Sequence, residues 1–153
     1  MIKVRVAAVG RLKEKYFADA VSEYAKRLSA YCRFEVVEVP AAPPSKSPAE
    51  QSAEEGRGLL AAARGFIVAL DGGGERLGSR AFAELIERES ARGHGEFTFL
   101  IGGSHGLSPE VKAAADKTLS FGDMTFPHQL FRVMLAEQLY RAFCIIAGTP
   151  YHK

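Results

Sequence analysis

Residues 66–74 of the chain are Phe-Ile-Val-Ala-Leu-Asp-Gly-Gly-Gly, five apolar residues followed by an acid and three glycines. A short apolar run without polar alternation is typical of a strand buried on both faces, as in a parallel sheet. Residues 97–103 follow a similar pattern, since Phe97–Ile101 leads into Gly102 and Gly103. Two such strands favour an α/β fold, a parallel sheet with helices on both faces.

Strand and helix patterns alternate along the rest of the chain. Further strands are predicted at 2–9, 34–39 and 118–121, which brings the number of strands to five. Apolar spacing and terminal signals predict helices at 17–31, 49–63, 79–92, from 109 onward, and at 129–147. We therefore expect residues 1–153 to form a single α/β domain.

The composition excludes several classes of protein. Hydrophobic residues make up 47% of the chain and charged residues 25%, which is the balance of a globular domain. No apolar run reaches membrane-spanning length, and the N-terminus lacks a signal-peptide pattern. Cys32, Cys144 and the four histidines show no metal-ligand spacing. These features predict a cytoplasmic protein that binds neither a membrane nor a metal.

Basic residues are concentrated near the N-terminus. Residues 1–33 contain eight lysines and arginines against three acids, whereas the remainder contains twelve basic and fifteen acidic residues. Such asymmetry is compatible with binding a polyanion. A solvated helix face is the simpler explanation, and the charge distribution alone favours it.

The last predicted helix is apolar on most sides. Its polar residues are scattered around the helix and do not form one face: Gln129, Arg132, Glu137, Gln138 and Arg141. A helix of this kind must be buried on most sides, which a small protein achieves most easily at a subunit interface. We therefore expect a homodimer.

Three predicted strands end in glycine-rich or irregular segments, after Leu70, Ile101 and Phe121. Ligands of parallel α/β folds bind at the carboxyl ends of the strands, where glycines allow the main chain to approach a ligand closely. We expect a nucleoside pocket there, lined by backbone and by apolar side chains. The tail 149–153 contains Tyr151, His152 and Lys153, which are suited to stacking on a base and contacting phosphate.

Two short motifs suggest other activities. Residues 102–106 match the Gly-x-Ser-x-Gly pattern of hydrolases, with Ser104 as the nucleophile. The next helix starts only near Ser108, so Ser104 is expected on an open loop without the strained turn of a hydrolase. Residues 73–79 resemble a phosphate-binding loop but lack its lysine.

The chain resembles the RlmH family of ribosomal RNA large-subunit methyltransferases, which belongs to the SPOUT class. The resemblance covers the whole chain and is carried by residues 100–108, 120–121 with 124–128, 132–133 with 137–142, and 151–153. It implies a SPOUT fold with a C-terminal trefoil knot and an obligate homodimer. It also implies methylation of N3 of a pseudouridine in large-subunit ribosomal RNA, on the assembled ribosome.

The resemblance further implies S-adenosylmethionine as the cofactor, bound in the knot. The matching positions for cofactor contacts are Leu70, Gly102, Phe121, Gly122, Asp123, Met124, Thr125 and Phe126. His105 stands where the family is expected to vary, so no special role is assigned to it.

For the reaction, we expect the tail to act on the base. His152 and Lys153, with Arg132 or Arg141, would orient the base and assist loss of the N3 proton, with His152 as a candidate general base. Tyr151 would help to place the base. The alternatives are a non-catalytic ribosome-binding factor and a small hydrolase that uses Ser104.

Overall fold

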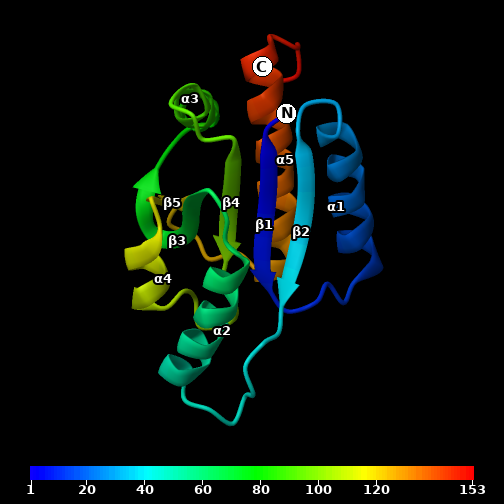
Figure 1. The fold of residues 1–153 in the computed structure, drawn as a ribbon. Coiled ribbons are helices and arrows are strands. Elements are labelled where there is room, and N and C mark those ends of the chain that lie inside the picture. The colour runs from blue at the N-terminus through cyan, green and yellow to red at the C-terminus, as the bar shows by residue number, and fades with distance from the viewer.

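A five-stranded parallel sheet forms the centre of the molecule in the computed structural model, which describes residues 1–153. Figure 1 shows the ten elements. The strands are β1 (Lys3–Val9), β2 (Arg33–Val39), β3 (Phe66–Arg76), β4 (Glu96–Ile101) and β5 (Lys117–Ser120). The helices are α1 (Lys15–Leu28), α2 (Pro48–Ala62), α3 (Ser79–Ala91), α4 (Pro109–Ala114) and α5 (His128–Ala147).

The strand order is β2-β1-β4-β3-β5, and every neighbouring pair is parallel. The two apolar runs of the sequence, in β3 and β4, are neighbours in the middle of the sheet, with Val68 opposite Phe99. Because all strands run the same way, their carboxyl ends lie at one edge of the sheet.

Helices cover both faces of the sheet, as the sequence predicts. On one face Val4, Val6 and Ala8 of β1 belong to the larger apolar core, together with residues of α3 and α5. On the other face Ala7 and Val9 belong to a smaller core with Leu59 of α2 and Val111 of α4. The single α/β architecture is confirmed, and the trefoil knot stays a prediction.

Strand β3 differs most from its predicted form. It runs on to Arg76 instead of ending at Leu70. Leu70 and Glu75 both lie opposite Leu119 of β5, so residues 71–74 bulge out of the ladder. Gly74 lies against the β5 backbone, where a Cβ would stand 2.7 Å from the Thr118 carbonyl. The glycines therefore form a bulge inside a strand rather than a loop after it.

The other differences are at element ends. Strand β5 is Lys117–Ser120, so Phe121 already belongs to the following loop. Helix α3 begins at Ser79, whose hydroxyl does not cap the helix and instead donates to Gln138 Oε1 of α5 over 2.8 Å. Helix α4 begins at Pro109, as predicted, and the Ser108 hydroxyl caps it by accepting a hydrogen bond from the Val111 amide.

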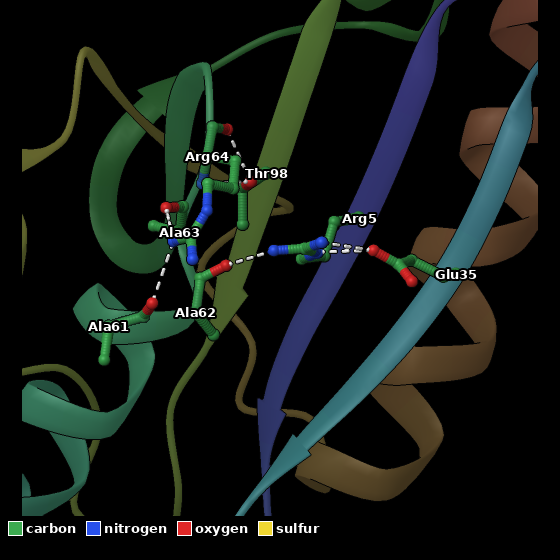
Figure 2. A network of polar contacts seen from close by, with 7 residues as sticks. All are labelled: Arg5, Glu35, Ala61, Ala62, Ala63, Arg64 and Thr98. Carbon is green, nitrogen blue, oxygen red and sulfur yellow. Dashed lines mark hydrogen bonds and ion pairs between the residues drawn. The ribbon is translucent and has the colours of Figure 1, made fainter.

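A network of polar contacts joins residues near the amino ends of β1, β2 and β4 to the end of α2 (Figure 2). The Arg5 guanidinium donates to Glu35 on β2 and, over 2.7 Å, to the Ala62 carbonyl at the end of α2. Thr98 on β4 accepts from the Arg64 amide and donates to the Arg64 carbonyl. Since the last carbonyls of a helix lack intrahelical partners, these contacts fix where α2 ends.

Replacing Arg5 is expected to destabilise the protein. Arg5→Ala leaves the Ala62 carbonyl without its donor, so the free energy of unfolding should fall by about 1–3 kcal/mol in urea denaturation. Lys3→Ala is the control, because Lys3 is exposed on the same strand and forms no ion pair. An equal fall in the free energy of unfolding in Arg5→Ala and Lys3→Ala would contradict the role given to Arg5.

None of the helices is both long and apolar enough to cross a membrane.

Candidate functional site

A cavity of about 480 Å³ opens at the carboxyl edge of the sheet. It lies among the three segments singled out in the sequence: the β3 bulge, the loop after β4 and the loop after β5. All eight predicted cofactor contacts line it: Leu70, Gly102, Phe121, Gly122, Asp123, Met124, Thr125 and Phe126. The structure thus brings together residues that are up to 56 positions apart in the chain.

The loop after β4 closes on itself tightly. The Gly106 amide donates to the Gly103 carbonyl over 3.1 Å, and the two residues form an isolated antiparallel bridge. A Cβ on Gly102 would stand 2.7 Å from the Gly106 carbonyl carbon, closer than real Cβ atoms approach backbone. This loop can take its shape only with glycine at position 102.

The loop after β5 supplies apolar walls. The rings of Phe121 and Phe131 pack with centroids 4.7 Å apart, and Phe126 lies 6.2 Å from Phe131. The Ser120 hydroxyl accepts from the Gly122 amide and donates to its carbonyl, which holds the turn at Gly122. Met124 is 81% exposed at the rim, where an apolar side chain is suited to cover a ligand.

The carboxylates in the cavity wall already have partners. Asp123 pairs with Arg76, and Asp71 accepts from the Gly73 amide and lies 3.8 Å from Lys112 Nζ. No group of three or more His, Cys, Asp or Glu side chains is placed to hold a metal ion. The cavity therefore offers backbone groups and apolar surface, with its acids engaged in ion pairs and hydrogen bonds.

Ser104 lacks the surroundings of a nucleophile. It is exposed in the loop that precedes α4, and it makes no hydrogen bond to a histidine or a carboxylate. The serine lies in the tight turn closed by Gly103 and Gly106, not on the open loop that the sequence predicts, and α4 begins only at Pro109. The geometry does not support a hydrolase.

The tail residues assemble around Glu137 of α5. The Tyr151 hydroxyl donates to Glu137 Oε2 over 2.7 Å, and Arg141 Nη2 donates to the same oxygen over 2.6 Å. Arg141 also lies 3.1 Å from His152 Nδ1, with its guanidinium 4.8 Å from the Tyr151 ring centroid. Lys153 is exposed and forms no ion pair. Glu137, which organises this cluster, was not predicted as a site residue.

The protonation of two members of this cluster follows from their surroundings. Burial, together with the Glu137 carboxylate, raises the pKa of Tyr151 well above its ordinary value, so the phenol stays protonated at neutral pH. The hydrogen bond to Glu137 raises the pKa of Arg141 as well. Tyr151 is therefore a hydrogen-bond donor rather than a proton acceptor, and Arg141 is a permanent cation.

Arg132 lies apart from the other predicted catalytic residues. Its side chain is 1% exposed, and Nη1 pairs with Glu38 Oε2 over 2.7 Å. Nη2 lies 3.2 Å from the Gly10 carbonyl. Arg132 lines neither the cavity nor the tail cluster. In this chain it joins α5 to the ends of β1 and β2.

Within one chain, the tail and the cavity do not meet. The first residue of α5, His128, lines the cavity, whereas the tail follows the last turn of this 20-residue helix. Such a helix is about 30 Å long. Figure 1 shows the C-terminus near the N-terminus, at the end of the sheet where β1 begins. Tyr151 folds back only as far as Glu137, and neither the tail residues nor Arg141 line the cavity.

A second cavity of about 450 Å³ lies between α3 and α5. It shares Leu119, Ser120 and Phe121 with the first cavity and reaches Glu137. Its wall includes apolar side chains on the outer side of α5, Val133 and Met134. Apolar surface therefore extends from the first cavity along α5 toward the tail cluster.

A parallel α/β sheet with a cavity at its carboxyl edge is the arrangement in which α/β proteins bind their ligands. The family model described as "Predicted SPOUT methyltransferase" matches residues 2–152, and the chain belongs to this family. It is thus a methyltransferase, and its family implies a methyl donor.

Named relatives agree with this assignment. The ribosomal RNA large subunit methyltransferase H of Limosilactobacillus reuteri (strain DSM 20016) is 49% identical over 159 residues, which cover 99% of this chain and all of that protein. The protein of the same name from Carboxydothermus hydrogenoformans is 48% identical, with the same coverage.

Solved structures share the fold at low identity. A probable methyltransferase from Bordetella pertussis Tohama I aligns with a TM-score of 0.58 at 16% identity, covering 93% of this chain and 96% of that one. A probable methylase family protein from Haemophilus influenzae Rd KW20 aligns with a TM-score of 0.58 at 12% identity, covering 100% of this chain and 72% of that one.

Proposed function

We propose that the chain transfers a methyl group from S-adenosylmethionine to N3 of a pseudouridine in large-subunit ribosomal RNA. The reaction would take place in the cytoplasm on the assembled ribosome, with a homodimer as the active form. The observation that carries this proposal is that the eight predicted cofactor contacts all line one cavity. The names of relatives with 48–49% identity support the class of substrate.

The cavity fits a nucleoside cofactor. Its volume of about 480 Å³ is within the usual range of small-molecule sites. Gly102 and Gly103 line it without side chains, and their packing against Gly106 and Val9 leaves no room for a Cβ, so a ligand there would meet main-chain groups. Leu70, Phe121 and Phe126 offer apolar surface to an adenine ring.

The reaction requires loss of the N3 proton and alignment of the nitrogen. When bound, S-adenosylmethionine supplies an electrophilic methyl group on a sulfonium. The tail cluster would bind the base: the Tyr151 ring, held by its hydrogen bond to Glu137, would help to place the base, and Arg141 and Lys153 would stabilise the developing anion. His152 is our candidate for the proton acceptor.

A homodimer would join the two halves of this site. Since the tail and the cavity of one chain lie apart, the tail must come from a second copy if both act on one base. The apolar surface of α5 around Val133 and Met134 is suited to such a contact.

Calorimetric titration of S-adenosylmethionine into the purified protein tests the proposal, followed by transfer of a labelled methyl group to 70S ribosomes. We expect saturable binding and one methyl group incorporated per ribosome. Ribosome binding without cofactor binding would instead favour a non-catalytic ribosome factor, and would overturn the methyltransferase proposal.

A further inference from the structure

We propose that residues 10–13, the basic loop, bind the RNA backbone at the rim of the cofactor cavity through Arg11 and Lys13. The inference rests on the proposed function and adds to it a surface for the substrate. It also gives a role to two of the eight basic residues in 1–33, none of which belongs to the cavity or to the tail.

The basic loop lies beside the cavity at both of its ends. It follows Val9, whose side chain lies so close to Gly103 that a Cβ there would stand 3.1 Å from Val9 Cγ1. At its other end the Lys13 amide donates to Gln129 Oε1 over 3.3 Å. Gly103 and His128, the neighbour of Gln129, both line the cavity. The loop therefore runs along one side of the rim.

The two cations of the loop are free to bind an anion. Arg11 and Lys13 are exposed, and neither forms an ion pair, whereas the next cation, Lys15, is paired with Asp19. Glu38, a carboxylate that contacts the loop, is engaged by Arg132 and by the Leu12 amide. Neither of these two charges is engaged in an ion pair within the chain.

The loop is also held in place. Its first residue donates from the Gly10 amide to the Val39 carbonyl and accepts from the buried Arg132 at 3.2 Å. The Leu12 amide donates to Glu38 Oε2 over 3.1 Å. A loop held by three hydrogen bonds at Gly10 and Leu12 loses little conformational freedom on binding, so its charges are preorganised for phosphates at the rim.

Phosphate contacts have a specific salt signature. Each neutralised phosphate releases counterions, so affinity falls with salt in proportion to the number of contacts. Removing two phosphate contacts should therefore weaken binding and also flatten its dependence on salt. A general loss of stability would not flatten it.

The test compares Arg11→Gln/Lys13→Gln with a matched control, Lys3→Gln/Arg33→Gln. The control removes the same charge from exposed, unpaired residues at the opposite end of β1 and β2. Binding to purified 70S ribosomes and methyl transfer to them are measured from low to moderate salt. Cofactor affinity is measured by calorimetry in all the proteins.

For the loop variant we expect an affinity for ribosomes about tenfold lower and a log–log salt slope smaller by about 1.5. Its KM should rise while kcat and cofactor affinity stay at the wild-type values, and the control should resemble wild type. An unchanged slope, or an equal effect in the control, would overturn the role of the loop. If the wild type binds ribosomes through the loop but transfers no methyl group, the proposed function is overturned and the role of the loop stands.

Discussion

Two inactive variants are expected to regain methyl transfer when they are combined in one dimer. Gly102→Trp displaces the loop that lines the cavity but leaves the tail intact, and deletion of residues 151–153 removes the tail but leaves the cavity intact. Each alone should lose at least about a hundredfold in rate, because each removes positioning or charge stabilisation at the reacting base. Coexpressed at equal levels, they should recover about one quarter of the wild-type rate, since half of randomly paired dimers carry one complete site.

We expect this recovery because the cavity lies at the start of α5 and the tail follows its end, so one chain cannot bring its own tail to its own cavity. In a mixed dimer, the intact cavity of the deletion variant meets the intact tail of the Gly102→Trp chain. The control combines Gly102→Trp with Gly103→Trp, a mixture in which no chain has an intact cavity, and it should stay inactive. The deletion variant should still bind S-adenosylmethionine. Verified mixed dimers that stay inactive would show that the tail and cavity do not form a site between copies.

The fold was predictable because burial dictates the pattern of residues. Phe66–Leu70 is wholly apolar and Phe97–Ile101 is apolar except for Thr98, and the structure places the two strands as neighbours in the middle of the sheet. The bulge at 71–74 was not predictable as part of β3. Its form depends on the close contact of Gly74 with β5, a strand more than forty residues later in the chain.

The cavity could be predicted as a set of residues, but the arrangement of the tail could not. Glycine-rich ends of parallel strands must meet at one edge, which places Leu70, Gly102 and Phe121 together. No sequence pattern shows that Tyr151 folds back onto Glu137, or that Arg132 is buried against Glu38. These contacts join residues 14 and 94 positions apart and depend on packing around α5.

Adding a single methyl group at position 102 is expected to weaken cofactor binding. In Gly102→Ala the new Cβ would stand 2.7 Å from the Gly106 carbonyl carbon and 2.8 Å from its oxygen. Both are backbone atoms, so the clash can be relieved only by moving the loop that closes the cavity. We expect the Kd for S-adenosylmethionine in calorimetry to rise at least about tenfold, which corresponds to about 1.4 kcal/mol.

Gly95→Ala is the matched control, since it adds the same methyl group in open space at the start of β4, away from the cavity. It should bind the cofactor as the wild type does. Thermal unfolding without ligand separates the two possible causes of weaker binding: displacement of a local loop leaves the midpoint nearly unchanged, whereas a damaged core lowers it. Wild-type affinity in Gly102→Ala would mean that the closed form of the loop is not the form that binds the cofactor.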